Sequence, residues 1–198
     1  MKPVRVVQGT ALPLDRSDVD TDQIIPAHWL KRVERTGFGR GLFSTWRDDR
    51  DFVLNDERYA GAKVLVGGPN FGTGSSREHA VWAILDHGFE AVVSPRFGDI
   101  FRNNATKNGL VPVVVPPDVG NALLRAVETD PTTEVTIDVE QRTLTASGAG
   151  GIVECEFPLD DATRERFLEG LDDIALSLRY ADDIGDYETQ RPDWLPTV

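Results

Sequence analysis

The residue types best suited to chemistry gather in one short stretch, residues 67–79, which holds four glycines, two serines, an arginine and a histidine. An apolar run at 62–67 precedes it and apolar residues at helical spacing follow it, so we predict a loop between a strand and a helix. The N–H groups of such a loop and the positive end of the helix dipole form an anion site. Arg77 in this loop indicates bidentate binding of a carboxylate or phosphate. A serine held beside these donors can be stabilised as an alkoxide and act as a base.

Three familiar loop motifs do not fit this stretch. A dinucleotide-binding GxGxxG needs a glycine where Arg77 stands, and a Walker loop needs a lysine where Thr73 follows Gly72. A GxSxG nucleophile elbow does not occur in it. A structural interpretation does fit, because Ser75 and Glu78 match the capping box S-x-x-E, in which the serine caps the helix. That interpretation leaves Arg77 and the four glycines unexplained, so both interpretations stay open.

The charge and the cysteine count exclude several classes of protein. With 21 basic and 33 acidic side chains the net charge is −12, which argues against a nucleic-acid binder and a polybasic membrane anchor. No apolar run approaches the roughly 18 residues that span a membrane, and the first residues lack the apolar core of a signal peptide. Cys155 is the one cysteine, and the three histidines lack helical zinc spacing, so metal or iron–sulfur chemistry must be completed outside this chain. We expect no cofactor bound by this chain and a reduced, cytoplasmic setting.

The apolar periodicity predicts an α/β fold with a mixed sheet and flanking helices. Strand, helix, strand, helix, strand over 62–115 is the pattern of a parallel layer, and Pro112 marks a strand start or an edge strand. Residues 4–13 alternate weakly and are expected to form an edge strand. Antiparallel strands are predicted at 134–139, 142–146 and 152–157, and helices at about 80–87, 98–107, 118–128, 161–169 and 171–178.

The chain is expected to form a single domain over residues 1–180, followed by an acidic, proline-containing tail over 181–198 that is partly disordered. Residues 31–41 are basic and contain glycines, which favours a mobile loop over a helix or strand. We expect His79 to pack or cap in the first turn of its helix.

The string Gly-Thr-Gly-Ser-Ser-Arg-Glu-His-Ala at 72–80 resembles the swivelling domain of the aconitase superfamily. Within it, the chain is most similar to the family of 3-isopropylmalate dehydratase small subunits. Asp-Val-Asp-Thr-Asp-Gln-Ile-Ile-Pro at 18–26 is similar to the N-terminal signature of that family. Further similar segments lie at 29–32, 35–38, 96–104 and 167–175, so the resemblance spans about residues 4–180 in order.

The resemblance implies a fold, an activity and a partner. The fold is the β/β/α swivelling domain, and the activity is that of a hydro-lyase that moves a hydroxyl between neighbouring carbons of isopropylmalate, a dicarboxylate, in leucine biosynthesis. In this family a [4Fe–4S] cluster is bound by three cysteines of the large subunit. Because this chain has one cysteine, the resemblance implies a heterodimer that is active only with the large subunit.

The resemblance also assigns roles to residues in both motifs. Ser75 matches the base that takes the substrate proton, and Arg77 matches the arginine that clamps a carboxylate, with a hydrogen bond from Ser76. Asp22 matches an aspartate beside this site, and Thr21 is expected to help position it.

A second cation for the substrate is expected in the basic loop, where two interpretations stay open. Related aconitases place another substrate arginine about ten residues after the Thr-Asp motif, and three residues here lie near that distance, namely Lys31, Arg32 and Arg35. The alternative is a solvated basic loop. Residues 27–33 are expected to line the pocket for the isopropyl group.

Two other functions are compatible with these residues. A sister hydro-lyase that acts on homoaconitate, citraconate or a methylmalate shares the Gly-Ser-Ser-Arg loop. A non-catalytic module on the same fold binds a dicarboxylate without a cluster-bearing partner.

Overall fold

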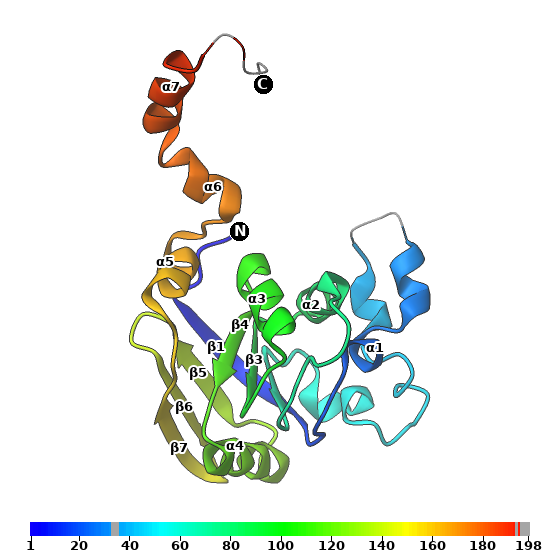
Figure 1. Ribbon diagram of the computed structural model, residues 1–198. Helices are drawn as coiled ribbons and strands as arrows, with labels where there is room; N and C mark the ends of the chain where they lie inside the picture. Colours follow the sequence, from blue (N-terminus) through cyan, green and yellow to red (C-terminus); the bar gives the residue numbers. More distant parts are fainter. Residues whose placement is uncertain (33–35, 193, 195–198) are drawn as a thin grey trace.

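The computed structural model describes residues 1–32, 36–192 and 194, and their central element is a seven-stranded sheet (Figure 1). The strand order is β4-β3-β2-β1-β5-β6-β7. Strands β1 to β4 are parallel, whereas β5 to β7 pair antiparallel, which confirms the predicted α/β fold with a mixed sheet. The strands are β1 (Val6–Leu14), β2 (Val64–Gly67), β3 (Ala91–Ser94), β4 (Val111–Val114), β5 (Glu134–Asp138), β6 (Thr143–Gly148) and β7 (Gly151–Glu156).

Strand β1 joins the two halves of the sheet, so the prediction that it is an edge strand is wrong. Its first half pairs antiparallel with β5, with Val6 opposite Asp138, and its second half pairs parallel with β2, with Leu14 opposite Gly67. Val6 is 48% exposed, whereas residues 11–14 are all buried. The alternation is weak because the strand passes from a half-covered sheet into a layer covered on both faces.

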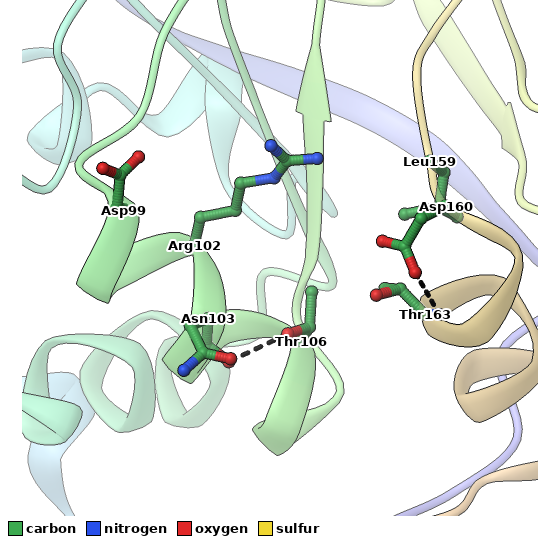
Figure 2. A pocket seen from close by; sticks show the side chains of 7 residues that line it. All are labelled: Asp99, Arg102, Asn103, Thr106, Leu159, Asp160 and Thr163. Carbon is green, nitrogen blue, oxygen red and sulfur yellow. Dashed lines mark hydrogen bonds between the residues drawn. The ribbon is translucent and has the colours of Figure 1, made fainter.

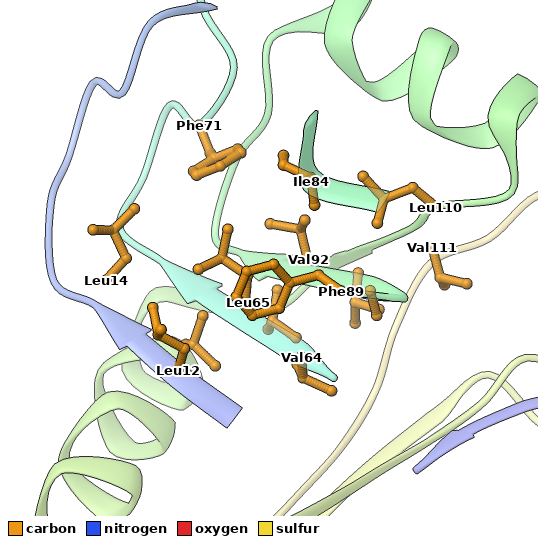
Figure 3. Close-up of a cluster of buried hydrophobic side chains, with 14 of the residues drawn as sticks. Leu12, Leu14, Val64, Leu65, Phe71, Ile84, Phe89, Val92, Leu110 and Val111 are labelled. Atoms are coloured by element: carbon orange, nitrogen blue, oxygen red, sulfur yellow. The ribbon is translucent and has the colours of Figure 1, made fainter. Parts of the chain in front are cut away.

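The parallel strands form the core that supports the loops at their ends. Figure 3 shows this core, in which Leu65, Val92 and Val111 from three neighbouring strands are completely buried. Strand β4 lies at the sheet edge, as Pro112 predicts, because proline has no N–H to donate to a further strand.

Helices cover the parallel layer on both sides (Figure 1). Helices α2 (Glu78–His87) and α3 (Asp99–Asn108) connect the parallel strands and pack against each other, whereas α4 (Pro117–Thr129) packs against β1, β2, β3, β6 and β7. Gly88 and Gly109 follow α2 and α3 as C-caps, both with a left-handed backbone, which glycine adopts readily.

Three helices follow the sheet: α5 (Asp161–Glu169), α6 (Asp173–Leu178) and α7 (Ala181–Thr189). Helix α5 buries Phe167, whereas α6 and α7, both within the described residues, bury no side chain and extend away from the body (Figure 1). Over Ala181–Thr189 the predicted partly disordered tail is instead a helix, whose first-turn acids Asp182 and Asp183 suit the positive helix end. None of the described helices combines the length and apolarity that crossing a bilayer requires.

Candidate active site

The candidate site lies at the carboxyl ends of the parallel strands, where the chain leaves both β1 and β2. The loops that follow these two strands are joined by backbone hydrogen bonds. The Gly72 N–H donates to the Val19 carbonyl at 2.7 Å, and the Thr21 N–H donates to the Thr73 carbonyl at 2.9 Å. The two stretches that carry the sequence resemblance therefore form one continuous surface.

Two glycines shape the loop after β2. Gly72 and Gly74 have left-handed backbones, with φ of 73° and 86°. A Cβ on Gly72 would lie 2.2 Å from Cγ of Phe101, so the position requires glycine. This backbone path leaves Ser75 and Ser76 exposed, where a substrate can reach their hydroxyls.

The predicted capping box between Ser75 and Glu78 does not form. Helix α2 begins at Glu78, and its N-cap is Arg77, which has an extended backbone and no side-chain cap. The Glu78 carboxylate instead accepts a hydrogen bond from Nδ2 of Asn108 at 2.8 Å. Ser75 lies too far before the helix to cap it, so the structural interpretation of the two serines is wrong.

A capping box does form on the neighbouring loop, at helix α1 (Thr21–Ile24). The Asp20 carboxylate accepts from the Gln23 N–H at 2.8 Å, and Oε1 of Gln23 accepts from the Asp20 N–H at 2.9 Å. The D-x-x-Q pattern was the available sequence signal for this box. The box fixes the backbone of Thr21 and Asp22, two of the predicted site residues.

Arg77 turns toward this short helix rather than toward solvent. Its Nη1 donates to Oδ1 of Asp22 in an ion pair and also lies 3.4 Å from the Ile25 carbonyl. The Arg77 side chain is 14% exposed and that of Asp22 is 55% exposed. The structure thus brings the predicted clamp and the predicted aspartate into direct contact.

Thr21 lies beneath the serine loop. Its side chain is 2% exposed, and its hydroxyl donates to the Ser75 carbonyl at 2.8 Å. A hydroxyl in this position contacts the backbone of the predicted base.

The basic loop contains more regular structure than predicted. The 3₁₀ helices η1 (Ala27–Lys31) and η2 (Phe38–Gly41) occupy its two ends, so the expectation of a loop without elements is wrong there. Arg32 lies over the rings of Trp29 and Phe38, and its Nη1 donates to the Gly37 carbonyl at 3.3 Å. Lys31 is exposed at the end of η1, and Arg35, with its neighbours 33 and 34, lies outside the described residues.

Helix α2 anchors the second end of the basic loop. The Gly39 N–H donates to Oδ2 of Asp86 at 2.8 Å. Phe38 packs edge-on against His79, with ring centroids 5.3 Å apart, and His79 also contacts the Trp82 ring. His79 therefore packs in the first turn of its helix, as predicted. The basic loop is fixed to the same helix that follows Ser75.

Asp18 and Asn70, which are not among the predicted site residues, also join the two loops. Both have left-handed backbones, with φ of 57° and 62°, and Nδ2 of Asn70 donates to Oδ1 of Asp18 at 2.7 Å. Asparagine and aspartate adopt this conformation more readily than most residues. Their residue types, just after two predicted strands, were the available signal.

The residues of this chain do not fit an iron–sulfur cluster. A cluster needs several thiolates, and the sequence has one cysteine, Cys155. Cys155 is half-buried on β7, and burial raises the pKa of its thiol. Across residues 1–32, 36–192 and 194, no three His, Cys, Asp or Glu side chains gather as metal ligands do.

A separate polar cleft lies between α3 and the first turn of α5 (Figure 2). Asp160 caps α5 there by accepting from the Thr163 N–H at 2.9 Å. Hydrogen bonds from Thr163, with a contribution from the Arg102 charge, hold the pKa of Asp160 below its usual range. The cleft contains none of the predicted site residues, and one of its two carboxylates, that of Asp160, caps α5.

Known proteins resemble this chain over its whole length. The sequence model of the aconitase C-terminal domain matches residues 1–118, and that of the C-terminal domain of 3-isopropylmalate dehydratase small subunits matches residues 173–198. A 3-isopropylmalate dehydratase small subunit of Parafrankia sp. is 61% identical, and one of Rubrobacter xylanophilus is 56% identical, each over the full length of both chains.

A solved structure supports the same assignment. The crystal structure of 3-isopropylmalate dehydratase from Methanocaldococcus jannaschii matches with a TM-score of 0.66 and 27% identity, covering 91% of this chain and 99% of that one. By its sequence over its whole length and by its fold, this chain belongs to the family of 3-isopropylmalate dehydratase small subunits.

Proposed function

We propose that this chain is the small subunit of a hydro-lyase that interconverts 2-isopropylmalate and 3-isopropylmalate in leucine biosynthesis. The enzyme removes water to give 2-isopropylmaleate and adds it back with the hydroxyl on the neighbouring carbon. One observation carries the proposal. Ser75 is exposed two residues before Arg77, and the Arg77 guanidinium already binds a carboxylate of the protein itself, that of Asp22. A proton acceptor and a carboxylate-binding group are what this chemistry requires of the chain.

Ser75 is the proposed base. Dehydration breaks a C–H bond beside the carbon that loses its hydroxyl, and a positioned group must accept that proton. The Ser75 hydroxyl is exposed two residues before Arg77 and three before the start of α2, so the Arg77 charge and the positive end of the helix dipole favour an alkoxide there. In the return step the Ser75 hydroxyl gives the proton to the carbon that lost its hydroxyl, while the hydroxyl adds to the carbon that lost its proton.

Arg77 is the proposed clamp for one substrate carboxylate, because a guanidinium binds a carboxylate through two parallel hydrogen bonds. Ser76 adds a hydrogen bond, and Asp22 holds the guanidinium in place. Lys31, Arg32 and Arg35 are the candidates for the second carboxylate.

The proposed partner is the large subunit, which would hold the [4Fe–4S] cluster because this chain has a single cysteine. This chain's own part is then to move the proton and to bind the carboxylates. We also propose a cytoplasmic setting, and a swivelling domain that comprises residues 1–180, with 181–198 as a separate acidic tail.

The test mixes the purified chain with a cluster-reconstituted large subunit without oxygen and follows 2-isopropylmalate dehydration by the absorbance of the unsaturated intermediate. Activity in the mixture and in neither subunit alone is the expected result. Turnover of homoaconitate, citraconate or a methylmalate in place of isopropylmalate would assign the chain to a sister reaction. A formed complex without turnover of any of these acids would contradict the catalytic proposal.

A further inference from the structure

Thr21 contacts the serine loop through both its backbone and its side chain. Its N–H donates to the Thr73 carbonyl at 2.9 Å, and its hydroxyl donates to the Ser75 carbonyl at 2.8 Å. The side chain is 2% exposed, so water does not compete for the second bond. The N–H and the hydroxyl of this buried residue therefore bind the loop on either side of Gly74.

The backbone around Ser75 needs this support because neither a helix nor a strand fixes its conformation. Gly74, immediately before it, has a left-handed backbone with φ of 86°, and helix α2 does not begin until Glu78. Within the described residues, the bond from Thr21 is the hydrogen bond that fixes the Ser75 peptide. Rotation of this peptide would move the serine hydroxyl away from a bound substrate.

We propose that Thr21 is a positioning residue for the reaction, and that its buried hydroxyl fixes the Ser75 peptide so that the Ser75 side chain meets the substrate proton. The inference rests on the proposed function of Ser75. Thr21 itself touches no substrate, because its hydroxyl is buried and committed to the carbonyl.

This role predicts a particular kinetic signature. Arg77 is held separately, by Asp22 and the Ile25 carbonyl, so loss of the Thr21 hydroxyl should leave the carboxylate clamp in place. Substrate binding should then persist while proton removal slows. A misplacement of about 1 Å costs up to roughly a hundredfold in rate.

The experiment compares three variants, each assembled with the reconstituted large subunit. Thr21→Val keeps the side-chain shape without the hydroxyl, and Thr21→Ser keeps the hydroxyl. Thr133→Val is the matched control, because Thr133 is also buried and its hydroxyl also donates to a backbone carbonyl, that of Asp130 at 2.7 Å. Thr133 lies outside both site loops, between α4 and β5.

The expected result for Thr21→Val is a fall in kcat of about ten- to a hundredfold, with KM within about twofold of the parent. The isotope effect on kcat with substrate deuterated at the reacting carbon should rise, because proton removal becomes slower relative to other steps. Thr21→Ser should restore kcat, and Thr133→Val should keep it. If Thr21→Val does not assemble, Thr21→Ala gives the same comparison.

Equal kcat in the Thr21→Val and Thr133→Val complexes would overturn the inference, as would a loss that Thr21→Ser does not restore. Ser75→Ala separates this failure from failure of the proposed function. If Ser75→Ala is inactive while Thr21→Val is normal, the base stands and the positioning role falls. If Ser75→Ala turns over normally, the proposed base itself is refuted.

Discussion

The Arg77 guanidinium donates to the Asp22 carboxylate across two loops that lie 55 residues apart in the chain. The Arg77 side chain is largely buried and that of Asp22 is half-exposed, so the pair holds the guanidinium against α1. Ion pairs with this much solvent contact stabilise a fold by only about 0–1 kcal/mol. The main effect of the pair is therefore to orient the Arg77 guanidinium before a substrate carboxylate binds.

Replacing Arg77 by lysine tests the clamp. Lysine keeps the charge but loses the planar fork, and a hydrogen bond to a charged group contributes about 1.5–3 kcal/mol. We expect the KM of the assembled enzyme to rise about tenfold or more, measured from initial rates of 2-isopropylmalate dehydration. Arg58→Lys is the control, because Arg58 pairs with Asp56 on a separate exposed turn. An unchanged KM in Arg77→Lys would count against the clamp.

Replacing Ser75 by alanine tests the base. General bases contribute about a hundred- to ten-thousandfold in rate, so kcat should fall by that factor. Folding and assembly should be kept, because the Ser75 side chain is exposed and its loop is held through backbone bonds. Size-exclusion chromatography checks assembly, and Ser147→Ala, an exposed serine on β6, is the matched control. Retained turnover in the Ser75→Ala complex would refute the mechanism but leave the family assignment intact.

The regular elements were predictable from periodicity, and the exceptions have physical causes. The strand–helix alternation over 62–115 and the three antiparallel strands are found as predicted. The sequence of β1 predicts an edge strand because it mixes the patterns of two environments, and the pairing of β1 with both β2 and β5 explains that mixture. The helix at Ala181–Thr189 was missed because it buries no residue and so carries no core pattern.

The sequence supplies candidate residues for the site, whereas the contacts between them come from the structure. The sequence resemblance points to Ser75, Arg77, Asp22 and Thr21, and the fold brings them together, with Thr21 buried beneath the serine loop. The periodicity of single segments does not reveal that Thr21 supports Ser75 or that Asp22 pairs with Arg77, since each contact joins two distant loops. The mistaken capping box at Ser75 has the same origin, because local pattern alone does not locate the helix start.

Replacing Gly72 by alanine tests how rigidly the loop is packed. The new Cβ would lie 2.2 Å from Cγ of Phe101, whose buried ring stacks on Phe97, so the clash adds to the left-handed strain. Overpacking costs about 1–3 kcal/mol and left-handed backbone about 1–2 kcal/mol. Gly61→Ala is the control, because its φ is 78° and nothing lies within 4 Å of its Cβ position. Urea unfolding should show the larger loss for Gly72→Ala, and equal losses would mean that the loop relaxes.

Shortening the chain tests the boundary of the domain. A chain that ends at Tyr180 loses α7, which buries no residue, so its free energy of unfolding should change by no more than about 0.5 kcal/mol. A chain that ends at Asp160 also loses α5, whose Phe167 is completely buried and accepts the Val4 N–H at 2.7 Å. Loss of a buried phenylalanine costs about 3–5 kcal/mol, so this shorter chain should unfold at a much lower temperature. If both truncations lower the free energy of unfolding by the same amount, residues 181–198 contribute to the stability of the folded domain, and a boundary at residue 180 is refuted.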